Sequence, residues 1–192
     1  MKRAAIIGGL IVLAVILLPA GYLLWKVNTA PQYDPATLEG IAQERVRDCG
    51  TAQPVLNFEI IERRDTADGT LLLFRAECFS LYRFVPIYGY LYGTQIGPGQ
   101  IQGNMGYGLG YGDTISGLAE YSLGGQLNDA TRPTVLYGRT LTAEVATVAA
   151  EFSSGTVLQD ETSEGYFAVI DPAGGVLKAL TLFDAAGNEL PQ

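Results

Sequence analysis

Few residues of this chain have side chains that commonly carry out chemistry. Its 192 residues include no histidine and two cysteines, Cys49 and Cys78. The most frequent general base and the most frequent zinc ligand are therefore missing, and two thiolates cannot complete a four-cysteine metal site. Lys178, the one lysine after residue 26, lies in no S-x-x-K sequence that would pair it with a nucleophilic serine. We expect no enzymatic activity and no cofactor.

Acidic residues are the remaining groups that could act as catalysts. Asp160, Glu161 and Glu164 cluster between two expected strands, where solvated carboxylates are typical. No D-x-D-x-D-G calcium loop occurs in the chain. Asp113 adjoins a stretch rich in tyrosine and glycine, and a carboxylate beside aromatic rings suits carbohydrate binding or hydrolysis.

Tyrosine and glycine alternate within residues 84–125, which hold half of the 24 glycines. If the alternating runs are strands, aromatic rings line one face and mainly glycine lines the other. The candidate face comprises Tyr88, Tyr90, Tyr92, Tyr107, Tyr111 and Asp113. Three interpretations are open: a core-lining aromatic ladder, a mobile glycine-rich loop over residues 93–106, or an exposed platform for a glycan or a protein partner. We favour the core, with tyrosine hydroxyls bonded to backbone carbonyls, because most aromatic side chains are buried.

The charge balance excludes one class of partner. The chain has 12 Lys+Arg against 20 Asp+Glu, a net charge of −8. Residues 29–192 keep nine basic and all 20 acidic side chains, a balance of −11. Nucleic acid requires a basic surface, so we expect no nucleic-acid partner. An acidic body is also repelled by anionic lipid headgroups and should stand off a bilayer.

The N-terminus has the composition of a membrane segment. Ala4–Trp25 is 22 residues long without an ionisable side chain, and as a helix it would span roughly 33 Å, enough for a bilayer core. The positive-inside rule places the N-terminus in the cytoplasm and the rest of the chain outside it. The expected membrane-interface residues are Lys2, Arg3, Tyr22, Trp25 and Lys26.

A cleaved signal peptide is the alternative to this anchor. The basic start and the apolar run fit both interpretations, but cleavage requires small residues at positions −1 and −3. Cleavage after Ala20 would put Leu18 at −3, and cleavage after Ala30 would put Asn28 there. We therefore favour an uncleaved anchor in contact with the lipid bilayer through residues 4–25.

A helix and a hairpin are expected after a short linker. Asp34-Pro35 is typical of a helix start and Gly50 of a helix end. The apolar face of this helix would carry Leu38, Ile41, Ala42, Val46 and Cys49. Strands are expected over residues 55–62 and 70–79 with a turn at Asp68-Gly69, and Leu72, Phe74, Ala76 and Cys78 would share the core face of the second.

Both cysteines thus lie on apolar faces of an exported region. This placement favours a Cys49–Cys78 disulfide between helix and hairpin, with two free buried thiols as the alternative. Closing the loop would contribute roughly 3–4 kcal/mol by the chain-entropy argument.

The C-terminal part has the pattern of a β-sandwich. Strands are expected over residues 134–139, 141–152, 165–170 and 176–183, separated by turns rich in glycine, with a bulge near residues 145–148. This succession of short strands and turns resembles the immunoglobulin-like (Ig-like) modules of many bacterial exported proteins, over residues 134–190.

The sequence therefore predicts a mainly β, α+β fold with an N-terminal transmembrane helix, one helix plus a β-hairpin, and a small antiparallel Ig-like β-sandwich. The expected parts are residues 1–3 as a cytoplasmic tip, 4–25 as anchor, 26–33 as linker, 34–125 as helix, hairpin and Tyr/Gly-rich segment, and 126–192 as sandwich. The expected function is that of a membrane-anchored extracytoplasmic interaction module or accessory subunit with an exported or membrane protein as partner. A carbohydrate-binding or carbohydrate-processing surface on the tyrosines is the alternative.

Overall fold

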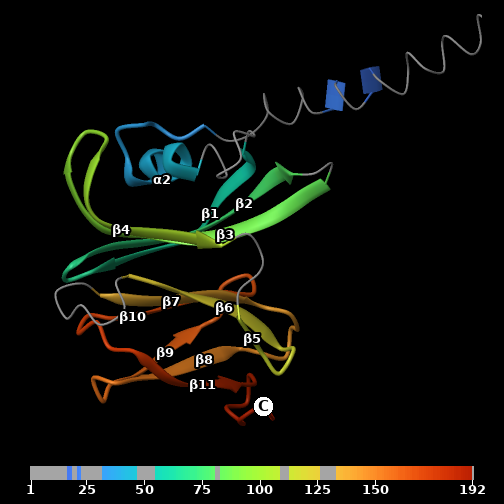
Figure 1. Cartoon of the computed structure of the whole chain (residues 1–192), viewed down its shortest axis with the longest axis vertical. Coiled ribbons are helices and arrows are strands. Elements are labelled where there is room, and N and C mark those ends of the chain that lie inside the picture. Colours follow the sequence, from blue (N-terminus) through green and yellow to red (C-terminus); the bar gives the residue numbers. More distant parts are fainter. Residues whose placement is uncertain are drawn as a thin grey trace, which may run out of the picture.

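The structure is a computed structural model of the chain and describes residues 17–18, 21–22, 32–46, 55–80, 83–108, 113–125 and 133–191. The described part is mainly β, with the helix α2 (Leu38–Val46) and three antiparallel sheets. These form four layers, which follow one another along the long axis of the molecule (Figure 1).

Helix α2 begins later than the expected helix. Asp34 caps a turn that precedes it, because its side-chain Oδ1 accepts the Ala36 N–H at 2.9 Å. Thr37 is the residue that caps α2, since its hydroxyl accepts the Gly40 N–H at 3.2 Å. The expected apolar face is confirmed: Leu38, Ile41, Ala42 and Val46 are all buried. Cys49 and Gly50 lie outside the described residues.

The first sheet, called the helix-side sheet, is a meander in the order β1-β2-β3-β4. Its strands are β1 (Val55–Thr66), β2 (Gly69–Ser80), β3 (Arg83–Gly97) and β4 (Gln100–Gly108). The expected hairpin is confirmed, with Thr66 paired to Gly69 across a two-residue turn. Strands β1 and β2 extend further than expected. The Tyr/Gly-rich segment adds two more strands, β3 and β4, to the same sheet.

The described residues from 113 onward form a sandwich of seven strands. The middle sheet has the order β10-β7-β6-β5 and the distal sheet the order β11-β8-β9. The strands are β5 (Asp113–Ile115), β6 (Ala119–Gly124), β7 (Thr134–Thr140), β8 (Thr147–Phe152), β9 (Val157–Glu161), β10 (Tyr166–Asp171) and β11 (Leu177–Phe183). Because β6 pairs with β7, strands β5 and β6 belong to the sandwich although they precede residue 126.

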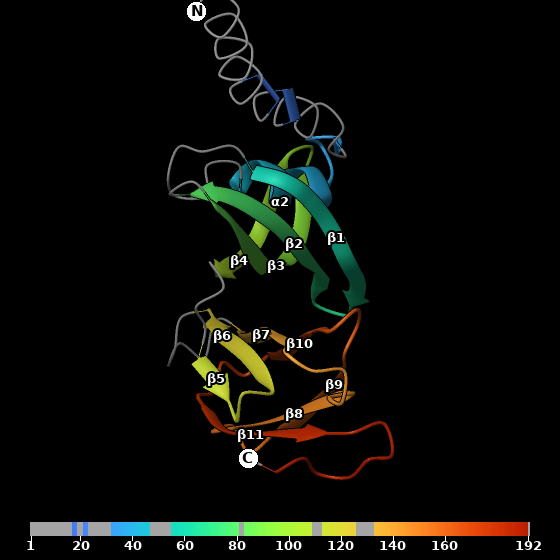
Figure 2. The ribbon, with the colours of Figure 1, turned by 90° about the vertical axis from the view of Figure 1, so that its right-hand side faces the viewer.

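The layers are stacked one on another (Figures 1 and 2), and three apolar cores lie between them. The first lies between α2 and the helix-side sheet, the second between the helix-side and middle sheets, and the third between the middle and distal sheets. The helix-side and middle sheets are therefore covered on both faces. Residues 87–93 of β3 are buried without exception, so that neither face of this strand meets solvent along that stretch.

Over residues 134–190, β7 pairs with β10 in the middle sheet, and β8 pairs with β9 and β11 in the distal sheet. The expected small antiparallel sandwich is confirmed, whereas its likeness to Ig modules stays a prediction. One segment differs from the expectation. Residues 141–146 are turn and loop rather than strand, and Val145 enters the third core from this loop without a bulge.

No helix among the described residues is long and apolar enough to cross a membrane. Most of the expected anchor, residues 4–25, lies outside the described residues, as do Lys2, Arg3, Trp25 and Lys26. Tyr22 is described and is about half exposed. The anchor and its interface residues therefore stay predictions.

Candidate functional site

The tyrosine face of β3 is internal. Tyr88, Tyr90 and Tyr92 project toward the middle sheet, and 1%, 0% and 7% of their surfaces are exposed. The middle sheet covers them as the core interpretation requires. Together these three side chains therefore present no open aromatic platform, and Tyr88 and Tyr90 are closed to a glycan.

Aromatic contacts join the two sheets at this face. The Tyr137 ring of β7 lies 4.9 Å from the Tyr90 ring and 6.0 Å from the Tyr88 ring, centroid to centroid. Tyr166 of β10 lies 6.3 Å from Tyr88, and the guanidinium carbon of Arg139 lies 5.8 Å from the Tyr88 centroid. Aromatic pairs of this kind contribute roughly 0.5–1.5 kcal/mol each beyond their burial. These contacts therefore hold the helix-side sheet against the middle sheet.

Glycines make room for the Tyr90 ring. A Cβ atom added to Gly106 of β4 would lie 2.8 Å from Cε1 of Tyr90, and one added to Gly124 of β6 would overlap its hydroxyl oxygen. A ring in one strand thus fills the space that glycine leaves in the adjacent strand and in the opposed sheet. The alternation of tyrosine and glycine is a packing pattern.

The tyrosine hydroxyls are not bonded to backbone carbonyls as expected. The hydroxyl oxygens of Tyr88, Tyr90 and Thr134 are buried without a hydrogen-bond partner among the described residues. Burial raises the pKa of Tyr90 and raises that of Tyr137 to about 12. Burial also raises the pKa of Tyr88, where the Ser122 hydroxyl opposes the shift without reaching hydrogen-bond geometry.

The other candidates of the tyrosine face lie elsewhere. Tyr107 pairs with Gly89, and directly opposed residues of an antiparallel pair share a face. Tyr107 therefore faces the α2 side and is 37% exposed. Asp113 is exposed on the short strand β5 of another sheet, and Tyr111 lies outside the described residues. The six expected residues do not form one surface.

Asp160 is not the solvated acid that the sequence suggested. It lies on β9 and is 6% exposed. Its Oδ1 accepts a hydrogen bond from Nη2 of Arg64 at 2.6 Å, and its Oδ2 accepts the Ala168 N–H at 2.7 Å. Burial raises the pKa of Asp160, and the Ala168 amide and Arg64 oppose that shift. This ion pair clamps β1 of the helix-side sheet to the sandwich, and Glu161 and Glu164 remain exposed.

Cys78 occupies the core face of β2, as expected, and is 1% exposed. It is disulfide-bonded, and the described residues contain no free cysteine. Cys49, the one other cysteine of the chain, lies outside the described residues. The Cys49–Cys78 pairing therefore stays a prediction.

No group of three or more His, Cys, Asp or Glu residues that could hold a metal ion occurs among the described residues. Lys178 is half exposed, and its Nζ lies 3.8 Å from the Glu151 carboxylate on the neighbouring strand. This lysine is placed as a surface charge on the distal sheet.

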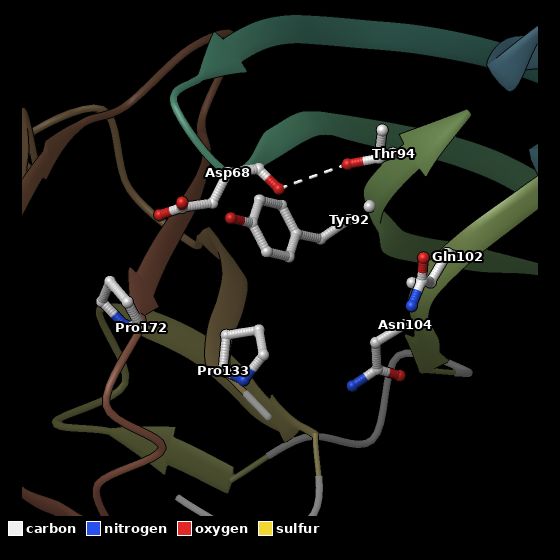
Figure 3. Close-up of a pocket in the computed structure, with 9 residues that line it drawn as sticks. Asp68, Tyr92, Thr94, Gln102, Asn104, Pro133 and Pro172 are labelled. Carbon is white, nitrogen blue, oxygen red and sulfur yellow. Dashed lines mark hydrogen bonds between the residues drawn. The ribbon is translucent and has the colours of Figure 1, made fainter. Parts of the chain in front are cut away.

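The structure also has one cavity, called the interlayer groove, that no sequence pattern predicted. It has a volume of about 600 Å³ and is lined by residues of the helix-side sheet and by two prolines that flank strands of the middle sheet. Its lining residues are Asp68, Tyr92, Gly93, Thr94, Gln102, Gly103, Asn104, Pro133 and Pro172. Figure 3 shows Tyr92 projecting between the Asp68 side chain and Pro133, with Gln102 and Asn104 on the neighbouring strand.

Comparison of the chain with known protein families, with curated proteins and with solved structures found no match.

Proposed function

We propose that the protein is a single-pass membrane protein with a cytoplasmic N-terminus and an extracytoplasmic body. The body would act as a structural or interaction module, or as an accessory subunit, of an envelope or membrane assembly. The uncharged apolar run of residues 4–25 supports the anchor. The Cys49–Cys78 disulfide proposed above fits an oxidising, extracytoplasmic location.

The layered stack is the observation that carries this proposal. Helix α2 follows the linker at one end of the molecule, and the C-terminal residues lie at the other end beyond β11 (Figure 1). An anchor before residue 32 would therefore place the sheets one after another outward from the bilayer. The strongly acidic balance of residues 29–192 supports the same arrangement, because anionic headgroups repel such a body.

The internal use of reactive side chains supports binding rather than catalysis. Tyr88 and Tyr90 fill the core between two sheets, and Asp160 ties Arg64 to the sandwich. Three of the side chains that seemed available for chemistry, Tyr88, Tyr90 and Asp160, are thus occupied in holding the layers together.

Membrane extraction of the full-length protein tests the anchor. We expect the protein to stay in the membrane pellet after an alkaline carbonate wash, with an intact mass that begins at Met1 or close to it. A matched variant without residues 4–25 should appear in the soluble fraction. Release of the full-length chain by the wash, or a mature N-terminus at Gly21 or Pro31, would overturn the proposal of an uncleaved anchor.

The role as a subunit has a separate test. After mild detergent extraction, native electrophoresis should show the chain in a species larger than its own micelle-bound mass, together with another membrane or exported protein. A chain that migrates alone at all detergent concentrations would contradict the accessory role.

One observation favours carbohydrate binding as a second candidate function. The interlayer groove combines a phenol, two carboxamides and a carboxylate with two proline rings. The tyrosines of the second core cannot carry this function, since Tyr88 and Tyr90 are buried.

A further inference from the structure

The interlayer groove owes its polar lining to the register of β3 and β4. Tyr92 pairs with Asn104, and Thr94 pairs with Gln102. Opposed residues share a face, so all four side chains lie on the face that looks toward the sandwich. At Tyr88 and Tyr90 the middle sheet covers this face, whereas Thr94 and Gln102 are exposed.

Three other segments complete the groove. Asp68 belongs to the turn between β1 and β2, and its carbonyl accepts a hydrogen bond from the Thr94 hydroxyl at 3.4 Å. Pro133 precedes β7 and Pro172 follows β10, so both prolines flank strands of the middle sheet (Figure 3). The groove is thus assembled from both sheets at the edge of the second core.

The polar groups of the groove retain their hydrogen-bonding capacity. Within the described part of the chain, the Asp68 carboxylate, the Tyr92 hydroxyl and the amides of Gln102 and Asn104 make no hydrogen bond or ion pair to the protein. A carboxamide both donates and accepts, a phenol does the same, and a carboxylate accepts. Four unused groups around one cavity form a set that a polar ligand can satisfy.

The charges of the groove limit the class of ligand. Asp68 is the single charged residue among the described residues that line it. Phosphate, sulfate and carboxylate ligands are held in proteins by arginine, lysine or helix N-termini, and the described lining offers none of these. A neutral ligand with many hydroxyl groups matches the donors and acceptors that are present.

We propose that the interlayer groove binds a neutral saccharide. Hydroxyl groups of the sugar donate to Asp68 and exchange hydrogen bonds with Gln102 and Asn104, while Pro133, Pro172 and the exposed edge of Tyr92 contact its C–H surface. The volume of about 600 Å³ lies within the range of roughly 300–1,000 Å³ that small-molecule sites occupy. This inference develops the second candidate function and depends on the body being exposed to glycans outside the cytoplasm.

The test uses the full-length protein in phosphatidylcholine nanodiscs, so that no sugar detergent is present. The probes are maltohexaose, cellohexaose and chitohexaose, with oligogalacturonate of matched length as the anionic comparison. Calorimetry should detect binding of at least one neutral hexasaccharide with a Kd below about 1 mM. The anionic probe should bind at least about tenfold more weakly, because it adds negative charge beside Asp68, and no cation lies among the described residues that line the groove.

Matched substitutions locate the binding. Gln102→Leu and Asp68→Asn should each weaken binding about tenfold, as the loss of one good hydrogen bond predicts. Gln159→Leu, an exposed glutamine of the distal sheet, and Asp65→Asn, on the same hairpin outside the groove, should leave the Kd unchanged. Far-UV circular dichroism checks that all four variants are folded.

Several results would overturn the proposal: no binding of any neutral probe, equal binding in Gln102→Leu and wild type, or equal loss in the Gln159→Leu control. Loss of a protein partner from groove variants that bind no saccharide would assign the groove to protein recognition instead. None of these results bears on the membrane anchor, which the carbonate wash and the N-terminal mass decide independently.

Discussion

Replacing Tyr90 by phenylalanine should stabilise the protein. The Tyr90 side chain is fully buried between two sheets, and its hydroxyl has no hydrogen-bond partner among the described residues. An unsatisfied buried polar group costs about 1–3 kcal/mol. Tyr90→Phe removes that group but keeps the ring against Tyr137, which lies 4.9 Å away between ring centroids. We therefore expect a gain of about 1–2 kcal/mol in the free energy of unfolding.

Removal of the whole ring should have the opposite sign. Tyr90→Ala leaves a cavity between Gly106 and Gly124, neither of which has a side chain to fill it. Large-to-small substitutions of buried aromatic residues cost about 3–5 kcal/mol. The phenylalanine and alanine variants should therefore lie on opposite sides of wild type, separated by roughly 3–5 kcal/mol, because they differ only by the buried ring.

Urea denaturation followed by circular dichroism measures these differences as shifts of the midpoint at constant slope. Tyr107→Phe is the matched control, because Tyr107 lies on the other face of the same sheet and is 37% exposed. It should change stability by less than about 0.5 kcal/mol. A loss of 1 kcal/mol or more in Tyr90→Phe would show that the hydroxyl has a partner, such as a buried water, and would refute the reasoning.

Three more predictions concern pH, the interlayer clamp and the cysteines. Burial raises the pKa of Tyr137 to about 12 in the fold, above the value of about 10 in the unfolded chain. The protonated hydroxyl therefore contributes about 2–3 kcal/mol to the free energy of unfolding below pH 10, and this contribution is lost as the pH rises from 10 to 12. A urea midpoint that does not fall over this pH range would contradict the prediction. Asp160→Ala removes the acceptor for Arg64 and for the Ala168 N–H, and should cost about 2–4 kcal/mol in the same assay. Asp160→Asn keeps an acceptor and should cost less; equal losses would speak against the clamp. Reduction should lower stability by roughly 3–4 kcal/mol if Cys49 and Cys78 are bonded, whereas thiol labelling without reductant would exclude the bond.

Local patterns predicted the individual elements well. The spacing of Leu38, Ile41, Ala42 and Val46 matches the 3.6-residue period of a helix and identified the face that is buried. Alternation in β2 placed Leu72 and the residues that share its face toward α2 correctly. Such patterns are short-range, so they do not depend on the rest of the fold.

The number of layers could not be read from the same patterns. Alternation indicates that one face of a strand is apolar, but it does not say whether a further sheet covers the other face. The unbroken apolar runs Leu71–Phe74 and Val135–Tyr137 were the available signal, since strands covered on both faces lack alternation. Read in this way, they would have predicted the second core that buries Tyr88 and Tyr90.

Contacts between distant residues had no local signal at all. The Asp160 carboxylate accepts a hydrogen bond from Arg64, which lies 96 positions away along the chain. The interlayer groove takes residues from several separate segments, from Asp68 to Pro172. Only the stacking of the sheets brings such residues together, and this is why the candidate site differs from the one that the sequence suggested.

Labelling with a membrane-impermeant maleimide in intact cells tests the central claim, an anchored body outside the cytoplasm, most directly. Gln159→Cys places a thiol on an exposed position of the distal sheet, and Lys2→Cys places one on the expected cytoplasmic tip. We predict that Gln159→Cys reacts in intact cells and stays in the membrane pellet, whereas Lys2→Cys reacts only after permeabilisation. Protection of Gln159→Cys until the cells are opened, or labelling of Lys2→Cys in intact cells, would contradict the proposed topology.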